Sequence, residues 1–359
     1  MTAVWSQIIG QARAVEKLRG LATSGVQSFL FISTDANARA ASSPTSTRSI
    51  ASVLITGSDD DSTREAGLIM RGEFADVNEI YRVGAAVDKE EAESIVGQSS
   101  TTPLEAKVKV IIIHEVHLMR DSAAVRLLKT IEEPAPQVVF ILLADQLVPS
   151  LTTLNSRCVV VNFVQLADAD IASALVAEGV FPATAESVAK VSQGNLARAR
   201  LLVTDNYLAR RQDAFASIAS RLDGTGATVV NIVADLLEQL DKAAEALEAM
   251  HEREVKELDD KVALTGERGS GRKALADRHK RELRKLRTDE LRSGLSIFAG
   301  IYKDLLLREP DRANGEEIIS AIGSIHKTIS ALGLNINESL ALHSLLIKCP
   351  PLKSLAATR

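Results

Sequence analysis

One short run of branched apolar residues constrains the fold of this 359-residue chain more than any other feature. Residues 109–114 read KVIIIH, in which Val110 is followed by three isoleucines. A continuous β-branched run of this kind is typical of a strand that is buried on both faces, as in parallel sheets. Ligands of open α/β sheets bind at the carboxyl ends of such strands. The polar residues that follow, HEVH at 114–117, are therefore the first candidates for chemistry.

The first 165 residues alternate helical and strand patterns. The segment SAAVRLLKTIEE at 122–133 is amphipathic and is followed by Pro134 and Pro136, which end a helix. The predicted strands are 29–32, 109–114, 138–144 and 157–163, and another helix is predicted at 11–22. Alternation of strands and helices predicts a parallel sheet with helices on its faces. We expect the stretch 35–63, which is rich in small polar residues, to be mostly loop.

From about residue 166 the strand signal disappears and only helical patterns follow. Residues 236–265 and 272–292 are dense in Glu, Lys, Arg and Ala, with apolar residues every three or four positions. This pattern predicts an antiparallel helical hairpin that projects from a helical domain. The segment between its arms, GERGSGRK, has the glycine spacing of a phosphate-binding loop. Such a loop joins a strand to a helix, whereas this one joins two charged helices, so we interpret it as the hairpin turn.

Composition limits the classes of function. The net charge is −5 and aromatic residues are 3% of the chain, so contact with nucleic acid requires a local basic patch rather than an aromatic platform. Two cysteines, Cys158 and Cys349, lie far apart in the sequence and do not predict a disulfide framework. We see neither a membrane-spanning apolar stretch nor a signal pattern, and we expect a cytoplasmic protein.

The HEVH segment invites a zinc interpretation. Metalloproteases place two histidines four residues apart on a helix, so that both face the metal. His114 and His117 are three apart and follow a strand, and no third ligand is evident nearby. We therefore predict no metal site, and keep a metal-dependent hydrolase that uses His114 and His117 as an alternative. A polar strand end without chemistry is a further interpretation.

Several motifs resemble those of AAA+ clamp-loader subunits, and they occur in that family's order. VWSQIIGQARAVEKLRGLA at 4–22 resembles the family's N-terminal box. Later segments resemble further parts of the family. These are the Walker B strand (VIIIHEVHLM), the next helix (LLKTIEEP), the sensor 1 strand (VVFILLAD), the Ser-Arg-Cys motif (SRC) and the sensor 2 region (GNLARAR). The resemblance covers about the first 205 residues and is nearest to the delta-prime branch of the bacterial DNA polymerase III clamp loader. The charged hairpin is similar to that of actinobacterial members.

The resemblance implies a three-part fold. It comprises an α/β AAA+ domain at 1–165 with helices on both faces of a parallel sheet, a small helical lid at 166–205, and an all-α collar domain at 206–359. The hairpin at about 236–292 is an insertion in the collar.

The nucleotide site of the family is degenerate in this chain. The segment after the first strand, STDANARAASSPTSTRS, has neither the glycines that let a backbone approach phosphate nor the lysine that binds it. The Walker B aspartate is replaced by His114, a poor magnesium ligand, and Asp145 occupies the sensor 1 position, where a carboxylate repels phosphate. Glu115 retains the position of the water-activating glutamate, and Arg198 the sensor 2 position, which we interpret as structural. We predict no nucleotide cofactor and no ATP hydrolysis. The family's four-cysteine zinc module also lacks its cysteines.

The Ser-Arg-Cys motif is intact at Ser156, Arg157 and Cys158. The resemblance implies that Arg157 acts in trans, as an arginine finger in a neighbouring subunit's ATP site. Guanidinium suits this role because it stays charged and forks onto phosphate oxygens. The alternative is that Arg157 caps a helix or pairs with a local acid. We interpret Cys158 as a small core residue.

The resemblance further implies a non-hydrolysing stator in a pentameric hetero-oligomer that loads a sliding clamp onto primed DNA. Its expected partners are gamma/tau-like ATPase subunits and a delta-like subunit. An ATPase-active subunit of the gamma/tau kind and a scaffold for other replication proteins are the alternatives. The basic run RHKRELRKLR at 278–287 could contact DNA, but the opposite arm contains the acidic HEREVKELDD, so pairing between the arms is favoured.

Overall fold

A computed structural model of the chain describes residues 3–33, 44–82, 86–145, 148, 151–203, 208–265, 272–308, 315–334 and 336–351. It contains two compact units, residues 1–199 and 200–359, each with its own internal contacts. The two units are described separately.

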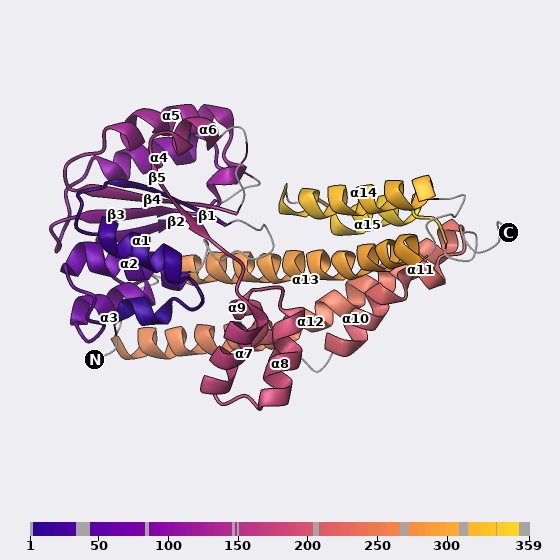
Figure 1. Cartoon of the computed structure of the whole chain (residues 1–359). Helices are drawn as coiled ribbons and strands as arrows, with labels where there is room; N and C mark the ends of the chain where they lie inside the picture. Colours follow the sequence, from indigo (N-terminus) through magenta and orange to yellow (C-terminus); the bar gives the residue numbers. More distant parts are fainter. Residues whose placement is uncertain are drawn as a thin grey trace. The chain divides into compact units, whose positions relative to one another are not determined.

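A five-stranded parallel sheet forms the centre of the first unit (Figure 1). The strand order is β2-β3-β4-β1-β5, and every neighbouring pair is parallel. The strands are β1 (Ser28–Ser33), β2 (Val77–Ile80), β3 (Lys109–Ile113), β4 (Val138–Ala144) and β5 (Val159–Phe163). All residues of β1, β3 and β4 are buried, as the apolar runs predicted. Four of the strands were predicted, whereas β2 was not.

Helices cover both faces of this sheet (Figure 1). One core cluster joins the first face to α1 (Ala12–Leu21), α2 (Pro44–Thr56) and α3 (Arg64–Arg71). A second cluster joins the other face to α4 (Lys89–Ser99), α5 (Asp121–Glu132) and α6 (Thr152–Asn155). The predicted α/β class, with helices on both faces of a parallel sheet, is confirmed.

The prediction that 35–63 is mostly loop is wrong for its second half, which forms helix α2. Small side chains explain the error, because Ala, Ser and Thr can pack a helix closely against its neighbours without a strong apolar pattern. Ile50 and Ala51 are fully buried, and Ser49 donates its hydroxyl to the carbonyl of Val4 at 3.1 Å. Residues 34–43 of the same stretch lie outside the described residues.

Three short helices follow the sheet, in the stretch where the sequence predicts helical structure only. They are α7 (Asp168–Ala177), α8 (Pro182–Val191) and α9 (Leu196–Val203). Gly194 precedes α9 with φ of +74°, and a Cβ there would lie 2.1 Å from the Gln165 side chain. Only glycine satisfies both demands at this position. The entry into this region is also fixed by Gln11, whose side chain exchanges two hydrogen bonds with the backbone of Val164.

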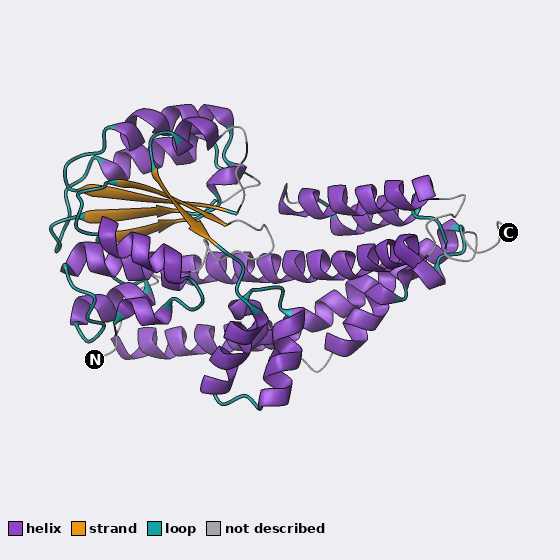
Figure 2. Cartoon of the chain, in the orientation of Figure 1, coloured by secondary structure: helices purple, strands orange, loops and turns teal. Residues whose placement is uncertain are grey.

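The second unit is built from helices in the part of it that the structure describes (Figure 2). The helices are α10 (Leu208–Ala216), α11 (Ile218–Arg221), α12 (Gly226–Thr265), α13 (Arg272–Arg308), α14 (Gly315–Ala331) and α15 (Glu338–Leu346). Their apolar faces enclose one large core that includes Phe215, Phe298 and Tyr302. Beside it, Arg211 donates to Glu290 at 2.7 Å, and both side chains are only 3% exposed.

The long helices α12 and α13 supply the arms of the predicted hairpin, whose turn at 266–271 lies outside the described residues. Charges pair between the arms, as predicted, since the Arg278 guanidinium contacts the Glu254 carboxylate. Two histidines make further polar contacts between them. His251 contacts Glu282 at 2.8 Å, and His279 contacts Glu254 at 2.7 Å. The two imidazole rings stack with centroids 3.8 Å apart. These polar side chains form the contact between α12 and α13 at this level. Nearer to the core, apolar side chains such as Leu247 form the contact between the same two helices.

Candidate functional site

The carboxyl edge of the sheet holds the residues that the sequence placed in the degenerate nucleotide site. Strands β3 and β4 are parallel neighbours, with Ile113 opposite Leu142, so the residues after them lie at one edge. His114 follows β3 and is 4% exposed, and Asp145 follows β4 and is 6% exposed. Both predicted positions are therefore at the strand ends where ligands of parallel sheets bind.

His114 is held inside the protein by a carboxylate from the neighbouring strand. Its Nε2 lies 3.5 Å from Oε2 of Glu79 in β2, and its ring stacks on Tyr81 with centroids 3.9 Å apart. Glu79 also accepts hydrogen bonds from Arg48 Nε at 2.5 Å and from the Tyr81 hydroxyl at 2.6 Å. His114, which the motif order predicts at the position of a magnesium-binding aspartate, is thus an imidazole with internal partners.

Glu79 is the electrostatic centre of this group. Burial alone would raise the pKa of its carboxyl group, because it disfavours the charged form. The His114 imidazole 3.5 Å away, hydrogen bonds from Arg48 and Tyr81, and the charge of Arg48 outweigh burial and lower the pKa to about 2. The carboxylate is therefore charged at all physiological pH values, and its charge is balanced by a protein cation.

Glu115 and His117 also have partners inside the protein. Glu115 adopts a left-handed backbone conformation with φ of 54°, and its carboxylate accepts a hydrogen bond from Arg82 Nε at 2.8 Å. His117 Nδ1 accepts from the backbone N–H of Asp145 at 3.2 Å. His114 and His117 thus contact different groups. Among the residues that the structure describes, no group of three or more His, Cys, Asp or Glu side chains is placed to hold a metal ion.

Arg157 lies at the opposite edge of the sheet. It precedes β5, and β5 is parallel to β1 with Val159 opposite Phe29, so Arg157 is near the amino edge. Its Nε donates to Glu132 Oε2 at 2.9 Å. Its Nη1 donates to the Thr153 carbonyl at 3.0 Å and to the Ser156 hydroxyl at 3.1 Å. This is the local acid pairing that the sequence left open as an alternative to the finger.

The neighbours of Arg157 in the motif have different environments. Ser156 is the C-cap residue of α6 and donates its hydroxyl to the Thr153 carbonyl at 2.9 Å. Cys158 packs against the second core cluster, and burial raises the pKa of its thiol to about 12. Such a thiol stays protonated and is a poor nucleophile, which agrees with the interpretation of Cys158 as a small core residue.

Comparison with known proteins relates the sheet domain to replication proteins. Residues 10–167 match the family described as DNA polymerase III, delta subunit. Over 151 residues the chain is 27% identical to DNA polymerase III subunit delta' of Bacillus subtilis (strain 168), covering 42% of this chain and 46% of that protein. The N-terminal part of the chain is therefore similar in sequence to delta-type subunits of DNA polymerase III. The motif resemblance is thereby confirmed. The chain spans about half the length of the curated relative that it matches.

Solved structures of low identity are similar over longer stretches. A gamma subunit-related protein of Thermotoga maritima is 17% identical with a TM-score of 0.42, covering 92% of this chain and 96% of that one. The Bacillus subtilis DNA clamp loader delta protein is 14% identical with a TM-score of 0.32, covering 96% of this chain and 99% of that one.

Arg198, which the motif order predicts at the sensor 2 position, is turned inward. It is 6% exposed, its backbone N–H donates to the Asn195 side chain at 3.0 Å, and its guanidinium donates to the carbonyl of Val191. These contacts tie the start of α9 to the end of α8. They give Arg198 a structural role in the region that precedes the second unit.

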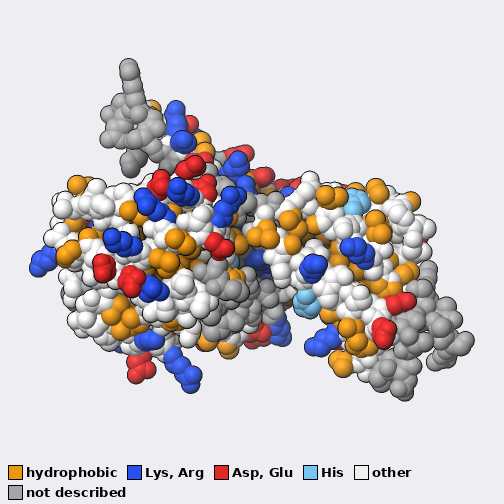
Figure 3. Space-filling view, turned by 90° about the horizontal axis from the view of Figure 1, so that it is seen from above, with side chains coloured by type: hydrophobic (Ala, Val, Ile, Leu, Met, Phe, Trp, Pro, Cys, Tyr) orange, Lys and Arg blue, Asp and Glu red, His pale blue; other side chains and the backbone are white. Residues whose placement is uncertain are grey.

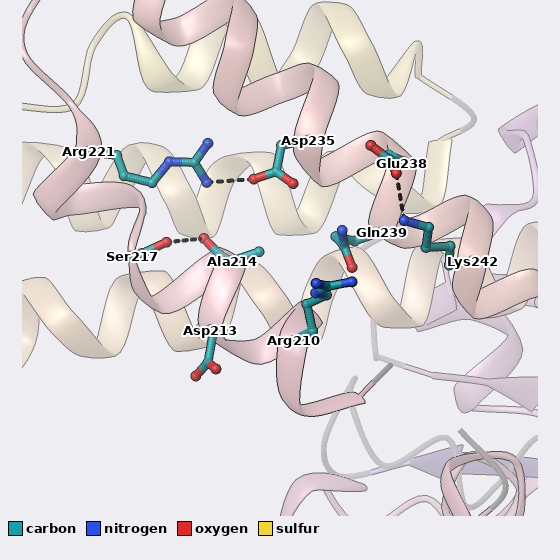
Figure 4. Close-up of a pocket in the computed structure, with 9 residues that line it drawn as sticks. All are labelled: Arg210, Asp213, Ala214, Ser217, Arg221, Asp235, Glu238, Gln239 and Lys242. Carbon is teal, nitrogen blue, oxygen red and sulfur yellow. Dashed lines mark hydrogen bonds and ion pairs between the residues drawn. The ribbon is translucent and has the colours of Figure 1, made fainter. Parts of the chain in front are cut away.

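A polar cavity of about 520 Å³ opens on the second unit between α10, α11 and α12 (Figure 4). Arg221 pairs across it with Asp235 at 2.6 Å, and Lys242 pairs with Glu238 at 2.5 Å. Its lining includes three basic side chains (Arg210, Arg221 and Lys242) and three acidic ones (Asp213, Asp235 and Glu238). Because these charges balance, the cavity favours neither an anionic nor a cationic ligand.

The surface and the helices limit other kinds of interaction. On the face that Figure 3 shows, basic and acidic side chains are interspersed among the described atoms. The described atoms of that face form no broad basic surface of the kind that binds nucleic-acid phosphates. No helix in the described ranges is long and apolar enough to cross a bilayer.

Sequence reasoning missed the partners of the predicted residues. Arg48, Glu79, Arg82 and Glu132 were not singled out, although each contacts a predicted site residue or lies beside one. Their separation in sequence gives no periodic signal. The one available clue was Glu132, which belongs to the LLKTIEEP motif.

Proposed function

We propose that this chain is a clamp-loader subunit of DNA polymerase III that does not hydrolyse ATP and that supplies Arg157 to a neighbouring subunit's ATP site. The proposed role is that of a stator in a ring that loads a sliding clamp onto primed DNA. The family match of residues 10–167 supports the clamp-loader assignment.

The observation that carries the non-hydrolysing part is the group around Glu79 at the carboxyl edge. A working nucleotide site offers carboxylates to Mg²⁺ and cations to phosphates. Here the Arg48 cation forms an ion pair with Glu79, and His114, which replaces the metal ligand, also contacts Glu79. Arg82 is likewise used on Glu115. The segment 33–47 contains neither glycine nor lysine, so it lacks both groups with which a phosphate-binding loop holds phosphates.

The proposed role of Arg157 is supported by its position. Its side chain is 32% exposed and lies at the amino edge, whereas the degenerate site lies at the carboxyl edge. In a head-to-tail ring, one edge of each subunit faces the other edge of the next. A guanidinium at the amino edge is therefore suited to serve a neighbour rather than its own chain. In-trans arginine fingers accelerate hydrolysis by roughly 10³–10⁵-fold.

The partners follow from the same proposal. An ATPase-competent subunit of the gamma/tau kind must supply the site that Arg157 enters, and a delta-like subunit completes a pentameric hetero-oligomer. The sliding clamp and primed DNA are the substrates of the assembled ring.

Titration of the purified chain with a fluorescent ATP analogue tests the non-hydrolysing role. We expect no saturable binding in the micromolar range, with an ATPase-competent clamp-loader subunit as the positive control. Tight binding would instead support the alternative of an ATPase-active subunit. Elemental analysis addresses the hydrolase alternative, because one zinc per chain would direct attention back to His114 and His117.

A further inference from the structure

The contacts of the Arg157 guanidinium leave it unable to grasp a phosphate with two nitrogens. A guanidinium binds an oxyanion in bidentate fashion through one of two edges, Nε with Nη2 or Nη1 with Nη2. Nε is bound to Glu132, and Nη1 is bound to Thr153 and Ser156. Each edge therefore has one nitrogen already engaged. A two-pronged phosphate contact requires at least one of these hydrogen bonds to break.

Glu132 differs from the other two partners in charge and in origin. Thr153 and Ser156 contact Arg157 from the same turn, four residues and one residue before it. Glu132 comes from the last residue of α5, 25 positions away, and is the anionic partner among the three. A carboxylate and a phosphate are competitors for one guanidinium, because both are anions that accept its N–H groups.

We infer that Glu132 is a latch that holds Arg157 in a phosphate-incompetent arrangement until a neighbour's ATP displaces it. This inference rests on the proposed function of Arg157. Glu132 is a positioning residue, since it acts on the phosphate only through Arg157.

The exposure of the pair makes such a latch reversible. The Glu132 side chain is 53% exposed and that of Arg157 is 32% exposed. Exposed ion pairs are weak and are screened by salt. The polyanionic triphosphate can therefore displace the Glu132 carboxylate at a small cost in free energy. Without a nucleotide nearby, Arg157 remains bound to Glu132.

The test uses the reconstituted ring with Glu132→Gln incorporated at wild-type stoichiometry. Glu133→Gln is the matched control, because Glu133 is the next residue, is exposed, and loses the same charge. The readout is the rate of single-turnover ATP hydrolysis by the ring. The rate of a ring that carries Arg157→Ala is subtracted, and the remainder is the part of the rate that depends on Arg157. We expect Glu132→Gln to raise this part by about two- to fivefold, the range of a weak exposed ion pair. Glu133→Gln should leave it unchanged.

Two further readouts separate a latch from a merely structural contact. The gain from Glu132→Gln should vanish in the double variant with Arg157→Ala, and it should shrink as salt is added. An unchanged or lower rate for Glu132→Gln would overturn the latch. If Arg157→Ala itself leaves hydrolysis unchanged, the proposed function fails. If Arg157→Ala slows hydrolysis and Glu132→Gln does not raise it, only the latch fails.

Discussion

The two edges of the parallel sheet use their charged residues in opposite ways. At the carboxyl edge, Glu79 and His114 have side chains that are 10% and 5% exposed, and they are bound to groups of the same unit. At the amino edge, Arg157 and Glu132 are 32% and 53% exposed. One edge is a closed polar core, and the other is an open ion pair.

Under the proposed function, this difference means that the fold has lost its own nucleotide site and keeps a role in a neighbour's. On the same proposal, the buried pairs of Glu79 at the carboxyl edge occupy positions that would bind metal and phosphate in a working site. Opening the amino edge costs little stability, because an exposed cation remains solvated. The predictions below test whether the two edges differ in this way.

The largest effect is expected from Glu79→Ala. The change leaves Arg48 and His114 without their shared carboxylate in a mostly buried site, so the free energy of unfolding of the first unit should fall by about 4 kcal/mol. Denaturant unfolding followed through Trp5, the single tryptophan of the chain, reports on this unit. The control is Glu73→Ala, which breaks an exposed pair with Arg71 and should cost less than about 1 kcal/mol. Equal losses in the two variants would contradict the closed carboxyl edge.

The same carboxylate makes stability depend on pH. Its folded pKa of about 2 lies below the ordinary value of 4.5, so its contribution is fully present above pH 4.5 and is lost as pH falls towards 2. The loss should amount to about 3 kcal/mol by the usual conversion of pKa to free energy. Trp5 unfolding curves between pH 5 and 2 measure it. Glu79→Gln should remove this part of the acid sensitivity, and an unaltered pH profile in that variant would refute the assignment to Glu79.

A smaller effect is expected from His114→Asp, which restores the residue type of a working Walker B strand. The new carboxylate would face Glu79 in a buried site, so we expect a loss of about 2 kcal/mol, with His114→Asn costing less. We also expect no gain in binding of a fluorescent ATP analogue, since the remaining phosphate-binding groups are still missing. A variant that bound ATP would show that the carboxyl edge is one substitution from function.

The sequence predicted long buried elements better than short or partly exposed ones. The runs in β3 and β4 are continuous and apolar, so they were recognised. β2 has four residues, of which only Val77 is buried, and it gave no signal. Helix α2 was taken for loop because its buried face is built partly from serine and threonine, such as Thr47.

The candidate site was predicted by position but not by partner. The motif order located His114, Asp145 and Arg157 at strand ends. Their contacts depend on residues 25 to 35 positions away, such as Glu79 and Glu132, which the packing of whole elements brings near. Sequence spacing cannot report such contacts, because they follow from the register of the sheet rather than from periodicity within one element.

Arg157→Ala in the reconstituted clamp loader tests the central claim most directly. The isolated variant should lose less than about 1 kcal/mol of stability, because the pair with Glu132 is exposed, and ring assembly should stay intact. Total ATP hydrolysis should fall partially, since one site loses its finger, and clamp loading should fall further. Arg157→Lys should rescue poorly, because an ammonium group lacks the guanidinium fork. Unchanged hydrolysis and clamp loading with Arg157→Ala at wild-type stoichiometry would contradict the account and leave Arg157 as a structural partner of Glu132.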